Sequence, residues 1–294
     1  MDVRKVQKTG NMHYVYLPTH WCKKHKITSV SNVSLEEGSR GELSIFPDIK
    51  EHLNKDLVLH VKEDNLDTIA KLIVACYINP ANSFKIKLDT DIDLNKLLLQ
   101  KRVFAVEFVE LDNKTIFCES GLSVSDPESL LKTLSRRIKS LVHVMVSDYD
   151  ESLIEKYEEE IDKGKVLLEK VVISSLASNR ILKVKAIDLH YISLIAYNLE
   201  NLVDNLIQLK KTETAFLKSL VLVVDSLNQV IEKLTTVHGI GEEEAIAFIN
   251  QVNSLKEIEV TNVSAYYKKR IRDCLMNVSE VLIDWAITNK LEAD

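Results

Sequence analysis

Three Glu-x-x-x-Asp pairs in the second half of the chain have the residue types and the spacing for metal chemistry. They are Glu158 and Asp162, Glu200 and Asp204, and Glu280 and Asp284. On a helix, residues four apart project from one face about one turn apart, so each pair aims two oxygen ligands at a common point. Like charges at this spacing weaken a helix, and a shared cation would relieve that repulsion.

Carboxylate ligands without a Cys or His partner favour Mg²⁺, Mn²⁺ or iron over Zn²⁺. Each pair has a simpler interpretation as a solvated acidic helix face. A fourth pair, Glu63 and Asp67, lies in the middle of the chain. The sequence therefore leaves two alternatives for these motifs, which are a site for a divalent or ferric metal and an ordinary acidic surface.

The first 26 residues concentrate positive charge on an otherwise acidic chain. Six Lys and Arg residues against one Asp give this segment +5, whereas the whole chain carries −6 and the remainder −11. Such a local basic segment is typical of a protein that binds double-stranded DNA at one place. The candidate contacts to the phosphate backbone are Arg4, Lys5, Lys8, Lys23, Lys24 and Lys26, and the candidate base readers are Asn11 and His13.

These basic residues also have a structural alternative, since a solvated amphipathic strand would show the same charge. Asn11 can equally serve the turn beside Gly10, because Asn tolerates the left-handed conformation. Tyr16 and Trp21 are expected to pack in a core and not to stack on bases.

The elements that must position these residues divide the chain into three predicted domains, at residues 1–49, 50–122 and 123–294. In the first, period-2 patterns predict four short strands, near residues 3–5, 14–17, 33–35 and 43–46, with Gly10, Gly38 and Gly41 at turns. Four such strands cannot make a self-sufficient core, so this domain should dimerise.

The middle domain alternates strand and helix patterns and predicts one helical layer over a mixed or antiparallel sheet. We expect strands at 57–62, 84–88, 103–111 and 115–120, and helices near 64–77 and 94–101. The chain contains no G-x-G-x-x-G, no G-x-x-x-x-G-K and no G-x-S-x-G motif. Nucleotide-driven and serine-nucleophile enzymes are therefore disfavoured, and no catalytic residue is assigned.

Six helices are predicted after residue 123, near 126–147, 150–178, 181–211, 213–237, 241–257 and 262–290. Asp126 with Pro127 and Glu128 forms a typical helix start. An apolar seam at steps of three and four residues runs from Leu189 to Leu209 and indicates bundle packing.

Cellular location follows from what the sequence lacks. The four cysteines, Cys22, Cys76, Cys118 and Cys274, lie far apart with no C-x-x-C spacing, so we expect them to be reduced. The apolar runs are much shorter than a membrane span, and the N-terminus begins with charge where a signal peptide would be apolar. These features predict a cytoplasmic protein.

The N-terminal segment RKVQKTGNMHYVYLP, followed by a short helix and NVSLEEGSRGELSIFP, resembles the swapped-hairpin DNA-binding domain of the AbrB family. The resemblance implies that two chains interlace their strands into one β-barrel. It departs from the family pattern at Ser31 and Asn32, where a Gly-Asp turn is usual before the third strand.

The helices from about residue 124 resemble PhoU, the regulator of phosphate uptake, with two three-helix repeats whose E-x-x-x-D motifs bind metal clusters. Glu158/Asp162 and Glu200/Asp204 match the motif helices of the first repeat, and Glu280/Asp284 matches the last helix of the second. The remaining motif helix, AFINQVNSL, carries Asn250 and Asn253 in place of carboxylates. The tandem, including ACYINPANSFKIKL in the middle domain, is similar to archaeal phosphate-uptake regulators.

Together the residues and the resemblances predict a homodimeric transcriptional regulator of phosphate homeostasis. In this hypothesis the hairpin barrel binds DNA and the bundle relays phosphate or metal status. The main alternative is an adaptor that does not bind DNA and regulates a phosphate transporter or a signalling kinase through protein contacts. A third hypothesis makes the bundle a metal-storage or metal-dependent phosphohydrolase unit.

Overall fold

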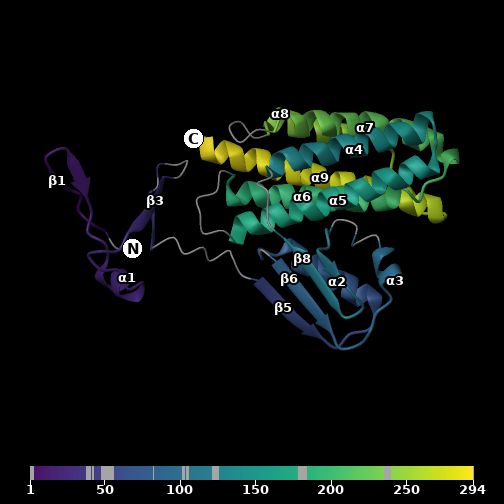
Figure 1. Cartoon of the computed structure of the whole chain (residues 1–294). Coiled ribbons are helices and arrows are strands. Elements are labelled where there is room, and N and C mark those ends of the chain that lie inside the picture. Colours follow the sequence, from purple (N-terminus) through teal and green to yellow (C-terminus); the bar gives the residue numbers. More distant parts are fainter. Residues whose placement is uncertain are drawn as a thin grey trace. The chain divides into compact units, whose positions relative to one another are not determined.

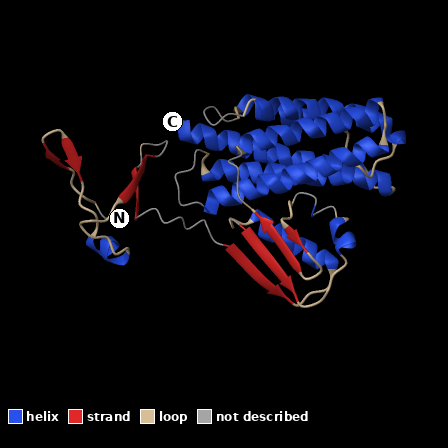
Figure 2. Cartoon of the chain, viewed as in Figure 1, coloured by secondary structure: helices blue, strands red, loops and turns tan. Residues whose placement is uncertain are grey.

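The computed structural model describes residues 3–37, 41, 43–47, 56–81, 83–100, 103, 106–120, 126–177, 184–234 and 240–293. The chain divides into two compact units, Met1–His52 and Leu53–Asp294. Most described residues of the second unit are helical, and the described strands form three small sheets (Figures 1 and 2). The predicted combination of α and β elements with a helical second half is confirmed. None of the described sheets closes into a barrel, so the two-chain barrel stays a prediction.

Two antiparallel β-hairpins and a short helix make up the described part of the first unit. The first hairpin joins β1 (Gln7–Thr9) to β2 (Met12–Tyr14), and the second joins β3 (Val33–Glu37) to β4 (Leu43–Pro47). Helix α1 (Thr19–Lys24) lies between the hairpins in the sequence. The two hairpins belong to separate sheets.

The first hairpin differs from the strands predicted at residues 3–5 and 14–17. Gly10 adopts φ +62° in the turn, a left-handed conformation that a glycine accepts without strain. Thr9 pairs with Met12 across this tight turn. Because strand pairing grows outward from a two-residue turn, the strands lie directly beside Gly10, and the predicted positions were wrong by a few residues.

The described residues of the first unit form no hydrophobic core in a single chain. No described side chain between residues 3 and 47 is buried. Val3, Met12 and Val30 are 83%, 72% and 88% exposed. Exposed apolar surface of this extent is costly in water, and apolar contacts beyond those among the described residues would reduce that cost.

The second unit begins with a four-stranded sheet whose strand order is β5-β6-β8-β7. Its strands are β5 (Asp56–Val61), β6 (Ser83–Leu88), β7 (Glu110–Leu111) and β8 (Thr115–Glu119). β5 is parallel to β6, and the other neighbours are antiparallel, so of the two predicted alternatives, a mixed and an antiparallel sheet, the structure has the mixed one. The strand predicted over 103–111 is reduced to β7, and its residues 104 and 105 lie outside the described chain.

Helix α2 (Leu66–Ile78) covers one face of this sheet, and the short helix α3 (Leu94–Leu98) follows β6 (Figure 1). Asn65 caps α2 by accepting a hydrogen bond from the Thr68 backbone N–H at 3.1 Å. The alternation of the strands sends one set of side chains into the core. That core contains Ile69, Ala70, Ile73, Phe84, Ile86, Leu97, Ile116 and Cys118, each fully buried.

Six long helices form the rest of the second unit, as predicted. They are α4 (Pro127–Ser147), α5 (Glu151–Ala177), α6 (Ala186–Leu206), α7 (Thr214–Glu232), α8 (Glu242–Asn253) and α9 (Val263–Ala293), with the 3₁₀ turn η2 (Lys211–Glu213) before α7. The predicted cap of the first helix is confirmed, because Asp126 accepts hydrogen bonds from the backbone N–H groups of Glu128 and Ser129 at 3.2 and 3.3 Å.

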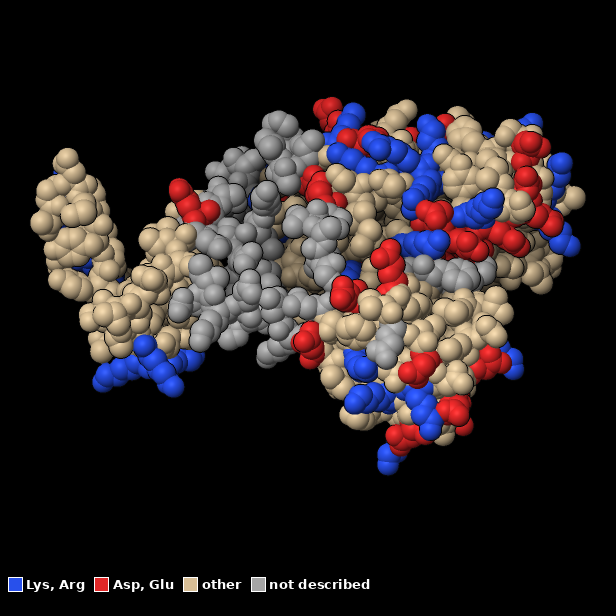
Figure 3. Space-filling view, viewed as in Figure 1, with Lys and Arg blue, Asp and Glu red and all other residues tan. Residues whose placement is uncertain are grey.

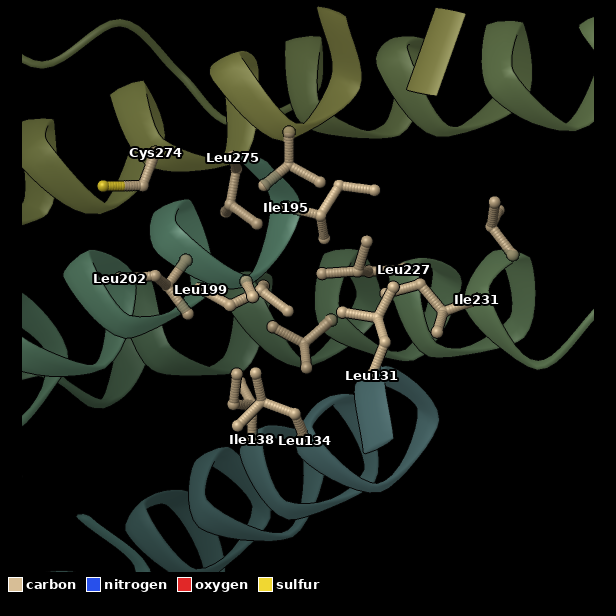
Figure 4. Close-up of a cluster of buried hydrophobic side chains, with 14 of the residues drawn as sticks. Leu131, Leu134, Ile138, Ile195, Leu199, Leu202, Leu227, Ile231, Cys274 and Leu275 are labelled. Carbon is tan, nitrogen blue, oxygen red and sulfur yellow. The ribbon is translucent and has the colours of Figure 1, made fainter. Parts of the chain in front are cut away.

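The predicted apolar seam of α6 forms the centre of the bundle core. Its residues Leu189, Ile192, Ile195, Leu199, Leu202, Leu206 and Leu209 are all buried. Figure 4 shows Ile195, Leu199 and Leu202 directed toward apolar side chains of neighbouring helices. α6 packs against α4, α5 and α9, so it contacts both the first helices of the bundle and the last one.

Among the described residues, the segment Lys211–Glu232 is long and apolar enough to cross a membrane by length and composition. In the fold it is α7 with its preceding turn, and Leu217, Leu220 and Val223 are fully buried. They belong to the same hydrophobic cluster as the seam of α6. Packing inside the bundle accounts for part of the apolar composition of this segment, because 39% of its apolar window is buried and Leu222 is 62% exposed.

Candidate nucleic-acid interface and acidic helix faces

All eight predicted DNA-contact residues are exposed on the first unit. Lys8 on β1 lies opposite His13 on β2, and Asn11 occupies the turn between them. Arg4 and Lys5, which the sequence placed on the first strand, precede β1 and belong to no helix or strand. The hairpin thus presents one basic strand and its leading segment to solvent.

The other three basic residues gather at the C-terminal end of α1. Lys23 and Lys24 lie in its last turn, where cations also stabilise the helix dipole. Lys26, predicted on the helix, lies just beyond it and adopts φ +54°, which ends the helix. Figure 3 shows a group of Lys and Arg side chains over this part of the first unit.

Two aromatic contacts border these basic groups. The rings of Trp21 and His25 lie 5.1 Å apart between centroids, and those of Tyr14 and Tyr16 lie 5.9 Å apart. Tyr16 is 62% exposed, and Trp21 is half-buried. Neither side chain is buried among the described residues, so the expected place of Tyr16 and Trp21 in a core stays a prediction.

The six predicted metal ligands differ in their surroundings. Glu158 on α5 is buried, Asp162 and Glu200 are half-buried, and Asp204, Glu280 and Asp284 are exposed. Asn250 and Asn253, which replace carboxylates in α8, are exposed as well. The three pairs thus do not share one environment, although α5 and α6, which carry two of them, pack against each other.

Lys165 on α5 binds the carboxylate of Glu200 on α6. Its Nζ lies 3.2 Å from Glu200 and 3.1 Å from Glu169, and its side chain is 16% exposed. Burial opposes the charge of this lysine, but the two glutamates outweigh burial and raise its pKa. An ammonium group therefore neutralises one predicted ligand. Lys165 was not among the residues predicted from the sequence, although its spacing of four from Glu169 on a helix is the signal for such an ion pair.

No group of three or more His, Cys, Asp and Glu side chains with metal-site geometry occurs among the described residues. In this arrangement the carboxylate of Glu200 is paired with the ammonium group of Lys165. Binding of a metal at α5 and α6 would require Glu200 to separate from Lys165.

A second lysine that the sequence did not reveal, Lys170, is buried where α5 meets the α/β layer. Its Nζ donates a hydrogen bond to the Ser120 hydroxyl at 2.7 Å and lies 3.7 Å from the centroid of the Tyr77 ring. Ser120 in turn donates to the backbone oxygen of Tyr77 at 3.2 Å. Burial lowers the pKa of Lys170 to about 8 and raises that of the neighbouring Cys118 thiol to about 12.

The fold and these sites together define a class of protein in which a basic hairpin unit, none of whose described side chains is buried, precedes an α/β layer and a bundle of six described helices. No protein-family model, curated protein or solved structure matches this chain.

Proposed function

We propose that this protein is a homodimeric, DNA-binding transcriptional regulator of phosphate uptake that acts in the cytoplasm and is not an enzyme. The observation that carries the proposal is the exposure of all eight candidate contact residues on a unit in which no described side chain is buried. Exposed Lys and Arg side chains supply the sequence-independent part of DNA affinity by displacing counterions from the phosphates. Asn11 and His13, beside them, would supply base contacts.

Dimerisation is the second element of the proposal. The first unit exposes Val3, Met12 and Leu35, and pairing with a second chain would cover apolar surface of this kind. A two-fold dimer would also present two basic arms to a pseudo-palindromic site. The resemblance to the AbrB family supports this arrangement of interlaced hairpins.

The bundle is the proposed sensing part, and the PhoU resemblance supports its link to phosphate. The ion pair between Lys165 and Glu200 is the contact through which a cation could act, because a metal bound by Glu200 would replace the ammonium group. Such an exchange would alter the packing of α5 on α6. Metal binding by the six carboxylates is part of the proposal.

The test is fluorescence anisotropy of the full-length protein with its own upstream DNA and with a scrambled duplex, at two salt concentrations. The variant Arg4→Ala/Lys5→Ala/Lys8→Ala removes six positive charges from a dimer. If each of them contacts a phosphate, the slope of log affinity against log salt should fall by about 5. The control Lys156→Ala/Lys218→Ala/Lys269→Ala removes the same charge from exposed positions on the bundle and should leave binding unchanged.

Absence of duplex binding at both salt concentrations would contradict the proposal and favour the adaptor, with the hairpins acting only in dimerisation. Protein that remains monomeric at micromolar concentration would also contradict it. Stoichiometric iron or manganese, together with phosphatase activity that Glu200→Gln abolishes, would instead favour the phosphohydrolase hypothesis.

A further inference from the structure

β5 is the longer of the two edges of the four-stranded sheet. Strand order places β5 and β7 at the edges, and β7 has two residues whereas β5 has six. An edge strand presents a row of backbone donors and acceptors to which another strand can add. β7 is too short to pair with an added strand. Among the described strands of this sheet, β5 is therefore the edge strand to which another strand can add (Figure 1).

The direction of the backbone groups of β5 follows from one hydrogen bond. The backbone oxygen of Val61 accepts from the backbone N–H of Asp89, directly after β6, at 3.2 Å. Val61 therefore turns its backbone toward β6, as does every second residue before it, because these groups alternate in direction along a strand. The N–H and C=O groups of Asp56, Val58 and His60 consequently point away from β6 and toward the open edge.

One antiparallel register about Leu59 suits both the charges and the apolar side chains of β5. Counting outward from Leu59 on both sides pairs Leu57 with Val61, Val58 with His60, and Asp56 with Lys62, the residue directly after β5. From this complementarity we infer that β5 adds to β5 of a second copy of the chain, antiparallel, about a two-fold axis at Leu59. The two four-stranded sheets then join into one sheet of eight strands.

This register satisfies the backbone and the side chains together. Val58 and His60 both direct their backbone groups outward, so they form hydrogen-bonded pairs across the axis. Asp56 faces Lys62 of the second copy on the open face, and the opposite charges attract. Asp56 already accepts from the Ser83 hydroxyl at 2.6 Å through Oδ1, and its second oxygen can accept from that lysine.

The apolar side chains gain burial in the same register. Leu57, Leu59 and Val61 are half-buried and pack at the margin of the core under α2. Each would meet an apolar side chain of the second copy, which extends the core across the axis. Val58 is 51% exposed on the other face and would lie beside His60 of the second copy. This inference does not depend on DNA binding or on the interlaced hairpins.

The register predicts a specific cross-link. Residues in a hydrogen-bonded antiparallel pair lie about 5.5 Å apart between Cα atoms, which a disulfide can span. The full-length variant Val58→Cys/His60→Cys, in a Cys22→Ser background, should therefore oxidise to a covalent dimer on a non-reducing gel. The control Lys87→Cys/Glu119→Cys places two cysteines on the inner strands β6 and β8 and should stay monomeric on the gel. A covalent dimer no more abundant than in the control would overturn the inference.

A proline variant tests the backbone contacts independently. Val58→Pro removes an N–H that faces the open edge and leaves the bonds between β5 and β6 intact, so the chain should fold as before. We expect its dimer dissociation constant, from sedimentation equilibrium, to rise at least tenfold. An unchanged constant would overturn the inference. Cross-linking without any DNA binding would instead contradict only the proposed function.

Discussion

Replacing Lys170 by Met should stabilise the protein at neutral pH and should remove a pH dependence of stability that we expect of the wild-type chain above pH 8. Burial lowers the pKa of Lys170 from the ordinary value of 10.5 to about 8. The unfolded chain therefore holds this proton more tightly than the folded chain does. Protonated Lys170 destabilises the fold, fully below pH 8, and the penalty disappears as the pH rises toward 10.5.

The magnitude follows from the size of the shift. A pKa unit corresponds to about 1.4 kcal/mol, so the penalty at pH 7 is roughly 3 kcal/mol, and roughly half of it remains near pH 9. Met has a similar length and can keep a contact with the Tyr77 ring, but it loses the hydrogen bond to Ser120, a loss of about 1 kcal/mol. Lys170→Met should therefore be about 2 kcal/mol more stable at pH 7 and about 1 kcal/mol less stable at pH 10.5.

The assay is urea unfolding of both proteins at several pH values from 7 to 10.5, with the difference in free energy of unfolding plotted against pH. Other titrations cancel in this difference, because they are common to both chains. Lys156→Met, at an exposed position of the same helix, is the control and should give a flat line. A flat line for Lys170→Met, or a less stable variant at pH 7, would refute the reasoning.

Three further predictions concern the bundle. Lys165→Met frees Glu200 from its ammonium partner. The affinity for Mn²⁺, measured by isothermal titration calorimetry, should therefore be at least tenfold higher than that of the wild type. Equal affinities would show that this lysine does not compete with metal. Leu199→Ala leaves a cavity in the centre of the core and should lower the free energy of unfolding by about 2–5 kcal/mol, whereas a loss under about 1 kcal/mol would contradict its central position. Asp126→Ala removes the cap of α4 and should cost about 1 kcal/mol in the same urea assay, and no measurable change would show that solvent replaces the cap.

The helices of the bundle could be predicted from the sequence because their signals are local. The seam from Leu189 to Leu209 repeats at the helical period, and its residues are buried in the structure. Asp126 and Pro127 marked the start of α4 within one residue. In both cases the signal lies within the helix or directly before it, so the helix could be predicted without knowing which distant segments it contacts.

The strands and the lysine contacts were harder to predict, since they depend on partners far away in sequence. The period-2 pattern at residues 3–5 predicted a strand there. The turn at Gly10 instead sets the register of the hairpin, so that residues 7–9 pair with residues 12–14. Lys170 meets Ser120 and Tyr77, which are 50 and 93 positions earlier in the chain, and nothing in its local sequence indicates burial. Lys165 and Glu200 likewise meet only through the packing of α5 on α6.

The lack of buried side chains among described residues 3–47 has a consequence for the dependence of folding on protein concentration. A unit that gains its apolar burial from a second molecule folds in a bimolecular reaction, so mass action governs its stability. Each tenfold dilution then weakens the paired form by about 1.4 kcal/mol, while the bundle, whose core lies within one chain, is unaffected. Pairing of the first unit would therefore require a threshold concentration of the protein in the cell. Below that concentration the hairpins would be present but unpaired.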